Sequence, residues 1–132
     1  MKAAEMRALI TGASGGIGRA LAQELHGRGA SVLLVGRNVQ ALEDAVRALG
    51  GRSARVDWCA ADLATAAGRA RVVEAANHWG GGVNVLVNSA ALDPKFDPAH
   101  HERTANAFED YPLEMWNQAL AVNLTGMFLC SQ

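Results

Sequence analysis

A glycine-rich stretch near the amino terminus has the residue types and spacing of an anion-binding loop. The segment "TGASGGIG" (residues 11–18) follows an apolar run and leads directly into a helical pattern. Glycine lets the backbone turn tightly and lets a phosphate approach the main chain, and the start of a helix presents free N–H groups to an anion. Leu21 stands where the usual G-x-G-x-x-G needs its third glycine. The spacing is instead Thr-Gly-x-x-x-Gly-x-Gly, through Thr11, Gly12, Gly16 and Gly18. A plain glycine-rich turn is the alternative.

Arg37 lies where the second apolar run of the sequence ends. An acidic residue about twenty positions after such a loop holds the ribose 2′-hydroxyl in proteins that use NAD. A guanidinium suits a 2′-phosphate instead, so we expect NADP to be preferred over NAD. Ser14 and Asn38 are the expected neighbours of that phosphate. The alternative for Arg37 is a solvated surface arginine.

Polar residues also follow the third and fourth apolar runs, Asp62 after one and Asn88 at the end of the other. Each alone is explained by capping, of the helix after Asp62 or of the loop that begins at Asn88. Together with Thr11 and Arg37, however, they occupy the carboxyl ends of successive strands, the edge at which open parallel sheets bind ligands. One binding site explains these positions better than independent caps do.

Asn123 shares a face of the last helical segment with Trp116, Leu120 and Met127. We therefore expect its amide to be buried. A buried amide without a partner costs about 1–3 kcal/mol, so it should bond to backbone, to water or to a catalytic group. A core asparagine at a local kink is the alternative.

The elements that position these residues follow from an alternation of strand-length apolar runs with segments of helical period. Strands are expected at about residues 7–11, 31–36, 55–63 and 83–90. The run "SVLLVG" is apolar at successive positions, as expected when both faces of a parallel sheet are covered. The alternation therefore predicts an α/β fold with a parallel sheet.

Helices are expected after each strand. The first carries Ile17, Leu21 and Leu25 on one face, and the second, which Asn38 can cap, carries Val39, Leu42, Val46 and Leu49. Residues 64–79 and the stretch from Pro112 onward form the others. Residues 92–111 have two prolines and no clear period, so they form either a lid over a site or a solvated insertion.

Composition limits the classes of partner. The 132 residues suit a single domain, and a net charge of -1 with evenly scattered charges leaves no basic patch for nucleic acid. The apolar runs are too short to cross a membrane, and the first ten residues do not resemble a signal peptide. Cys59 and Cys130 are expected in the core of a reduced, cytoplasmic protein. The adjacent His100 and His101 point apart in most backbones, so no metal site is expected.

Taken in order, these motifs resemble the short-chain dehydrogenase/reductase family from Met6 to the last residue. "TGASGGIG" resembles the family's cofactor loop, and "ADL" (61–63) resembles its adenine-contacting Asp-Leu. "VNSAA" (87–91) resembles its Asn-Asn-Ala-Gly strand end, with Ser89 and Ala91 as replacements, and "VNLTGMF" (122–128) resembles the helix that carries its catalytic asparagine. The resemblance implies a Rossmann-type doubly wound parallel sheet of about four strands in the order 3-2-1-4.

The resemblance also implies roles for individual residues. Asp62 and Leu63 would contact the adenine, Asn88 and Ala90 the cofactor ribose region, and Asn123 would hold the water of a proton relay. The expected catalytic residue is thus Asn123, and the expected cofactor-binding residues are Thr11, Gly12, Ser14, Gly16, Ile17, Gly18, Arg37, Asn38, Asp62, Leu63, Asn88 and Ala90.

A second part of the family pattern is missing from this sequence. Hydride transfer in the family needs a tyrosine as acid/base, a lysine four residues further on, and a serine. Here Tyr111 is followed four residues on by Met115, and neither Lys2 nor Lys95 has matching spacing. We therefore expect residues 1–132 to be a single NAD(P)-binding domain that lacks the family's carboxyl-terminal half and is inactive alone.

The complete protein is then expected to be an NAD(P)-dependent oxidoreductase that transfers hydride between a nicotinamide and a small ketone or alcohol, and to be a homo-oligomer. The alternative is a non-catalytic dinucleotide-binding module or a truncated product. Without a neighbouring strand, residues 83–88 would form an exposed apolar edge, so the chain alone is expected to be poorly soluble or to self-associate.

Overall fold

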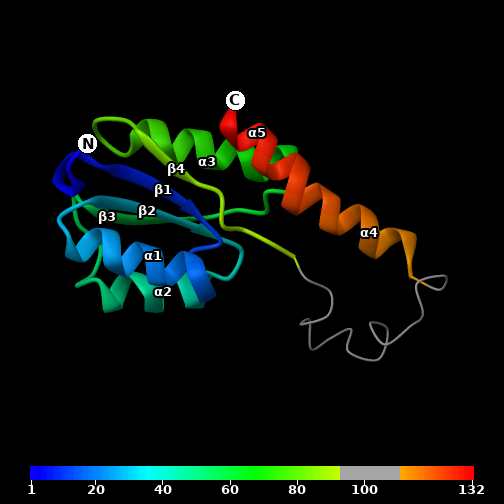
Figure 1. The fold of residues 1–132 in the computed structure, drawn as a ribbon, viewed down its shortest axis with the longest axis horizontal. Helices are drawn as coiled ribbons and strands as arrows, with labels where there is room; N and C mark the ends of the chain where they lie inside the picture. The colour runs from blue at the N-terminus through cyan, green and yellow to red at the C-terminus, as the bar shows by residue number, and fades with distance from the viewer. Residues whose placement is uncertain (93–110) are drawn as a thin grey trace.

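Four parallel strands form one sheet in the order β3-β2-β1-β4 (Figure 1). They are β1 (Arg7–Thr11), β2 (Ser31–Gly36), β3 (Val56–Ala60) and β4 (Val85–Val87). The structure is a computed structural model in which residues 1–92 and 111–132 are described. The expected Rossmann-type sheet and its strand order are confirmed. The expected lid at residues 92–111 and the pair His100 and His101 lie outside the described residues, apart from the lid's two ends.

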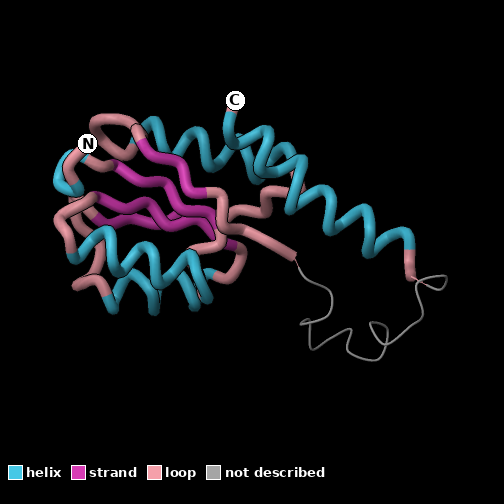
Figure 2. Tube along the Cα trace, in the orientation of Figure 1, coloured by secondary structure: helices cyan, strands magenta, loops and turns pink. Residues whose placement is uncertain are grey.

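Each face of the sheet packs against its own helices. On one face lie α1 (Gly16–Gly27) and α2 (Val39–Ala48), and on the other lie α3 (Ala66–His78) and the last helical segment (Figures 1 and 2). That last segment consists of α4 (Leu113–Leu120), a π-helical segment η5 (Ala121–Gly126) and α5 (Met127–Ser131), while a short 3-10 helix, η1 (Ala3–Glu5), precedes β1.

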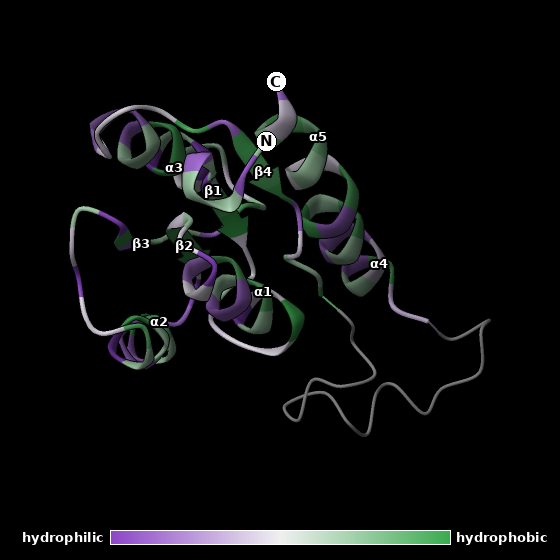
Figure 3. Ribbon diagram, turned by 60° about the vertical axis from the view of Figure 1, so that its left-hand side comes forward, coloured by the Kyte–Doolittle hydropathy of each residue, from purple (hydrophilic) through white to green (hydrophobic). Residues whose placement is uncertain are grey.

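The strands alternate their side chains between two core layers. Val32 and Leu34 of β2 pack among residues of α1 and α2, whereas Leu33 and Val35 pack with α3 residues such as Val72. Because both faces are covered, every residue of β2 after Ser31 is buried. This is the reason for the continuous apolar run, and Figure 3 shows how strongly hydrophobic the strands are compared with the helices.

The packing face expected for α1 is wrong. Ile17 is 76% exposed and Leu21 is 37% exposed, while Gly18 and Ala22 are buried and Leu25 is partly buried. The cause is close approach: a Cβ added to Gly18 would lie 2.6 Å from the carbonyl oxygen of Gly12. Only small side chains fit between α1 and the end of β1, so the large ones turn outward.

The buried stripe expected around Asn123 is also wrong. Trp116 is 53% exposed and Met127 is 41% exposed, and Asn123 itself is exposed. The buried residues of this segment are Met115 and Gly126, and a Cβ on Gly126 would lie 3.3 Å from the carbonyl oxygen of Leu63. The wider turns of η5 shift the helical phase, and the close contact at Gly126 decides which face packs.

One edge of the described sheet is β4, whose three residues are all partly buried. This agrees with the apolar edge expected at residues 83–88, and its effect on solubility stays a prediction. Within residues 1–92 and 111–132, no helix has the length and apolar character needed to cross a membrane.

Candidate functional site

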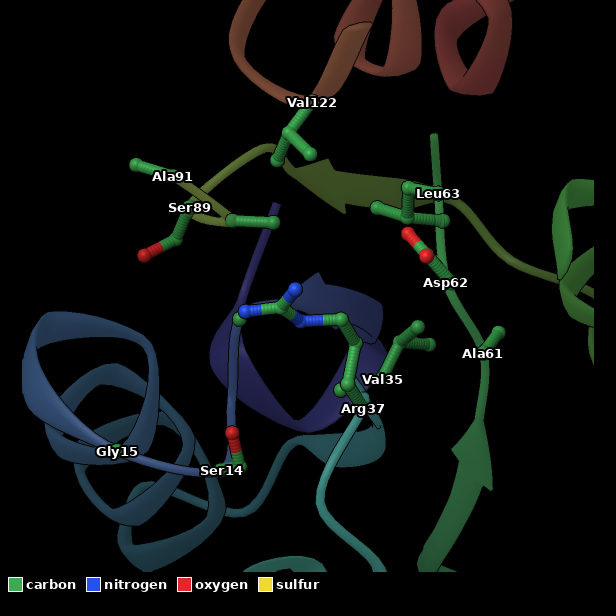
Figure 4. A pocket seen from close by; sticks show the side chains of 13 residues that line it. Ser14, Gly15, Val35, Arg37, Ala61, Asp62, Leu63, Ser89, Ala91 and Val122 are labelled. Atoms are coloured by element: carbon green, nitrogen blue, oxygen red, sulfur yellow. The ribbon is translucent and has the colours of Figure 1, made fainter. Parts of the chain in front are cut away.

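A cleft of about 280 Å³ opens at the carboxyl edge of the sheet (Figure 4). All four strand ends contribute to it. They supply Gly12, Ser14 and Gly15 after β1, residues 35–37 at the end of β2, residues 61–63 after β3 and residues 89–91 after β4, and Val122 of η5 completes the lining. The four strand ends thus meet at one edge as expected, although of the four polar residues named there only Arg37 and Asp62 line the cleft.

The glycine loop is held tightly against the end of β4. Gly12 has a φ of +68°, and a Cβ there would lie 2.7 Å from the backbone of both Ser89 and Ala90. Helix α1 then begins at Gly16 after an N-cap, Gly15, that makes no side-chain capping bond. The first N–H groups of α1 are therefore free of side-chain partners, and the bare backbone around them leaves room for a phosphate.

Thr11 ties β1 to the chain that follows β4. Its buried hydroxyl oxygen accepts hydrogen bonds from the backbone N–H groups of Ser89 and Ala90, at 3.0 Å each, and its O–H donates to the Val87 carbonyl at 3.4 Å. Thr11 does not line the cleft. It positions the two residues that do.

We expect Thr11→Val to lower the free energy of unfolding by about 1–2 kcal/mol, because it keeps the side-chain shape and leaves two N–H groups without an acceptor. Urea denaturation followed by circular dichroism measures the change. Thr125→Val is the control, since Thr125 is exposed in η5 and its variant should stay within about 0.5 kcal/mol of the parent. Equal stability of the two variants would contradict the role given to Thr11.

Arg37 lies at the mouth of the cleft, directly after the last residue of β2. Its side chain extends between Ser14 and the segment of Asp62 and Leu63 (Figure 4). The guanidinium is exposed and makes no hydrogen bond or ion pair with any described residue. Ser14 is held close by, because a Cβ on Gly36 would lie 3.0 Å from its Oγ. An arginine with free donors next to a serine hydroxyl has the chemistry of a phosphate site.

Asn38 is confirmed as the cap of α2, since its Oδ1 accepts a hydrogen bond from Ala41 N at 3.0 Å. It does not line the cleft. Because its Oδ1 is used in the cap, the side-chain group that Asn38 would offer to a 2′-phosphate is its amide nitrogen.

Asp62 and Leu63 both line the cleft, and the capping alternative for Asp62 is wrong. The N-cap of α3 is Thr65, whose Oγ1 accepts a hydrogen bond from Gly68 N at 2.9 Å. Asp62 forms the turn before it: its Oδ1 accepts from Ala64 N, and its carbonyl accepts from the Thr65 hydroxyl. Helix α3 approaches so closely that a Cβ on Gly68 would overlap the carbonyl oxygen of Asp62.

The two asparagines are engaged outside the cleft lining. The Asn88 amide nitrogen donates to Ser131 Oγ at 3.2 Å. Asn123 Oδ1 accepts from Leu92 N at 2.7 Å, and its Nδ2 donates to the Leu92 carbonyl at 3.0 Å. The expected backbone partner of Asn123 is thus present although the expected burial is not. In this arrangement its side chain positions the chain after β4, and its neighbour Val122 lines the cleft.

The predicted residues divide into two groups. Those that line the cleft are Gly12, Ser14, Arg37, Asp62, Leu63 and Ala90. Those that lie around it without lining it are Thr11, Gly16, Ile17, Gly18, Asn38, Asn88 and Asn123. The lining residues that sequence reasoning missed are Gly15, Val35, Gly36, Ala61, Ser89, Ala91 and Val122. All of these except Val35 are sequence neighbours of a predicted residue, and Val35 lies two positions before Arg37. Apolar residues at strand ends carry no chemical signal of their own.

Cys59 and Cys130 are free thiols that lie partly or fully in the core, as expected. Burial raises the pKa of the Cys59 thiol, an effect that Arg71 opposes and that Asp57 and Glu74 reinforce. Burial also raises the pKa of Cys130, against the opposing charge of Arg69. Across residues 1–92 and 111–132, no group of three or more His, Cys, Asp or Glu side chains is placed to hold a metal ion.

Both thiols should therefore alkylate slowly in the folded protein, because the thiolate is the reactive form. The alkylation rate can be measured by mass spectrometry of iodoacetamide-treated protein over a pH series. In the folded protein this rate should begin to rise at a higher pH than it does in the urea-unfolded chain. The folded state holds these protons more tightly than the unfolded one. Their contribution to stability is therefore complete below about pH 8.5 and is lost as the pH rises through the folded-state pKa. Equal rates in folded and unfolded chains would contradict this.

The fold and the cleft define a class of protein: a doubly wound α/β domain with a glycine loop, a helix amino terminus and the strand carboxyl ends around one ligand site. A sequence model described as "short chain dehydrogenase" matches residues 6–132, so the chain belongs to the short-chain dehydrogenase family.

Individual relatives agree with this membership. The chain is 32% identical over 121 residues to D-beta-hydroxybutyrate dehydrogenase of Cupriavidus necator, a match that covers 92% of this chain and 43% of that protein. It is 34% identical over 125 residues to D-threitol dehydrogenase of Mycolicibacterium smegmatis, covering 95% and 44%. Among solved structures, L-sorbose reductase from Gluconobacter frateurii, complexed with NADPH and L-sorbose, superposes with a TM-score of 0.78 at 30% identity, covering 96% and 44%. The chain thus spans less than half the length of these three relatives.

Proposed function

We propose that this chain binds a nicotinamide dinucleotide, with NADP preferred over NAD, as the cofactor-binding part of an oxidoreductase. The complete enzyme would transfer hydride between the nicotinamide and a small ketone or alcohol. One observation carries the proposal: four strand ends and the amino terminus of α1 surround a single cleft, in which Arg37 has free donors.

The residues around the cleft fit the parts of a dinucleotide. The free N–H groups at the start of α1, at Gly16, Ile17 and Gly18, suit the pyrophosphate, because an anion is favoured at a helix amino terminus. The close packing of Gly12 and Gly18 supports this, since side chains there would collide with the neighbouring backbone. Asp62 and Leu63 would flank the adenine, and Asn88 and Ala90 would lie by the ribose on the nicotinamide side.

The preference for NADP rests on Arg37, whose guanidinium and the nearby Ser14 would bind the 2′-phosphate. The related L-sorbose reductase from Gluconobacter frateurii, solved in complex with NADPH, supports this preference.

The nicotinamide, when bound, supplies the hydride donor or acceptor of the reaction. The chain's residues do the positioning. Thr11 holds Ser89 and Ala90 at the cleft wall, and Asn123 holds the backbone of Leu92 beyond it. The sequence contains no Tyr-x-x-x-Lys, so we propose that residues 1–132 bind the cofactor without supplying the acid/base that turnover requires.

Two further proposals concern the cellular location and the oligomeric state of the complete protein. A reduced, cytoplasmic location is supported by two free cysteines among the described residues. A homo-oligomer is supported by the apolar side chains that α4, η5 and α5 expose, among them Trp116 at 53%, Leu124 at 57% and Phe128 at 58%.

Isothermal titration of the 132-residue chain with NADPH and NADH tests the proposal. We expect saturable binding of both, tighter for NADPH, and no oxidation of NADPH in the presence of a panel of ketones. Absence of binding would overturn the proposed function. Turnover by this chain alone would overturn the proposal that its residues bind the cofactor without supplying the acid/base. If a longer chain also bound the cofactor and showed no turnover, the result would favour a non-catalytic dinucleotide-binding module.

A further inference from the structure

A second cavity lies along the open edge of β3. Its volume is about 550 Å³, and it is bounded by β3, by the last turns of α3 and by Arg7 at the start of β1. It shares no lining residue with the cleft at the carboxyl edge. A ligand bound there would therefore use none of the residues that line the proposed dinucleotide site.

The lining of this cavity is rich in positive charge. Arg7, Arg52 and Arg71 line it with a single carboxylate, that of Asp57. Asp57 forms an ion pair with Arg52 at 2.5 Å, so its charge is already balanced. The net charge of -1 for the whole chain makes this local excess of two guanidinium groups unusual.

Two of the arginines are held in place by tryptophans of the same cavity. The Arg7 guanidinium carbon lies 4.8 Å from the centroid of Trp79, and that of Arg52 lies 5.2 Å from the centroid of Trp58. Arg7 also donates to the carbonyls of Gly82 and Trp79, at 2.7 and 3.1 Å, which offsets the negative end of α3. A guanidinium fixed on an indole loses little conformational entropy when an anion binds.

Arg71 provides the uncommitted charge. It lies on α3, and its guanidinium makes no hydrogen bond or ion pair with any residue of 1–92 or 111–132. Arg71 and Cys59 both line the cavity, so the charge of Arg71 lies at its wall.

One lining residue of the cavity is a tryptophan whose indole nitrogen is buried. Trp79 is only 7% exposed, and its indole Nε1 has no hydrogen-bond partner among the described residues. Because Nε1 itself has almost no accessible surface, the part that this ring plays in the cavity is to hold Arg7 by stacking.

We propose that this cavity binds the phosphate group of a small molecule, at a site formed by Arg7 and Arg71 with Arg52 at its rim. A phosphate offers three acceptor oxygens and a charge near -2, which matches the excess of two guanidinium groups over carboxylates in this lining. An added peptide strand fits the edge of β3 less well. The outward N–H of Trp58 already donates to the carboxylate of its neighbour Asp57, at 2.8 Å, and so is not free for a new strand.

Titration of the 15N-labelled 132-residue chain with inorganic phosphate, at constant ionic strength, tests this site. The indole N–H signals of Trp58 and Trp79 should move and saturate, while that of Trp116, which is exposed on α4, should not. Glucose 6-phosphate should move the same two signals and glucose should not, and the tighter of the two phosphates identifies the source as free phosphate or an ester. Movement confined to the amides of residues 12–18 would place phosphate at the glycine loop only and overturn the proposal.

Arg71→Ala should weaken phosphate binding at least tenfold. Arg47→Ala is the matched control, because Arg47 is an exposed helical arginine paired with Asp44 on α2, away from the cavity, and its variant should bind as the parent does. Arg71→Glu should abolish the shifts of both indoles. Equal affinity in the parent and both Arg71 variants would overturn the proposal, and since Arg71 is exposed, all three chains should fold.

Discussion

Gly68→Ala should lower the free energy of unfolding by about 2–3 kcal/mol, although alanine is the better helix former, because the added methyl group overpacks a backbone contact. Gly68 is buried in the first turn of α3, where a Cβ would overlap the backbone of Asp62. The main chain has no rotamer to change, so α3 or the turn at Asp62 must move. Urea denaturation of the two chains measures the difference.

The same displacement should weaken NADPH binding more than it weakens binding of reduced nicotinamide mononucleotide, which has no adenine to contact Asp62. Gly27→Ala is the matched control. Gly27 is also a helical glycine, at the end of α1, but nothing lies within 4 Å of its added Cβ, so this variant should be as stable as the parent or more stable by up to about 1 kcal/mol. If the Gly68→Ala chain were as stable as the Gly27→Ala chain, the close contact between Gly68 and Asp62 would not have the destabilising effect expected here.

Arg37→Ala should weaken NADPH binding about 10- to 100-fold and leave NADH binding unchanged, because charge-assisted hydrogen bonds contribute about 1.5–3 kcal/mol each and NADH has no 2′-phosphate. Arg37 is exposed and unpaired among the described residues, so its loss should not change folding stability. Fluorescence titration with both cofactors measures the two dissociation constants.

The dependence of cofactor affinity on salt concentration is a second test of the same interaction. In the parent, the advantage of NADPH over NADH should shrink as ionic strength rises, and in Arg37→Ala it should be small at every salt concentration. Arg47→Ala, which removes a paired arginine from the far side of α2, should keep the parent's preference. Equal losses of NADPH and NADH affinity in Arg37→Ala would show that Arg37 does not recognise the 2′-phosphate.

Much of the fold and the candidate site could be predicted from local patterns. The run "SVLLVG" becomes a strand buried on both faces, and the glycine spacing becomes the turn in which Gly12 takes a positive φ. The patterns that predicted these features, the strand-length apolar run and the spacing of the glycines, are properties of neighbouring residues. The placing of Arg37 and Asp62 at one edge followed from the rule that parallel strands end together.

The predictions that were wrong or incomplete concern which face of a helix packs on the sheet and which residue a polar side chain bonds to. A stripe of large apolar residues identifies a contact surface, but it does not say which surface meets this chain's own sheet. For α1 and for the segment from α4 to α5, the close approach of Gly18 to Gly12 and of Gly126 to Leu63 made that decision, and Ile17 and Trp116 therefore face outward. The partner of Asn123 is Leu92, thirty-one positions away, and no local pattern names such a pair.

By itself, then, the sequence determined the order of the elements, the glycine loop and the chemistry at each strand end, because strand and helix periods and glycine's backbone freedom are local properties. Only the tertiary structure decided what encloses the cleft, how Thr11 and Asn123 hold its wall, and that Arg7 and Arg71 meet at a second cavity. Those features depend on distances between residues far apart along the chain, which are set when the whole core packs.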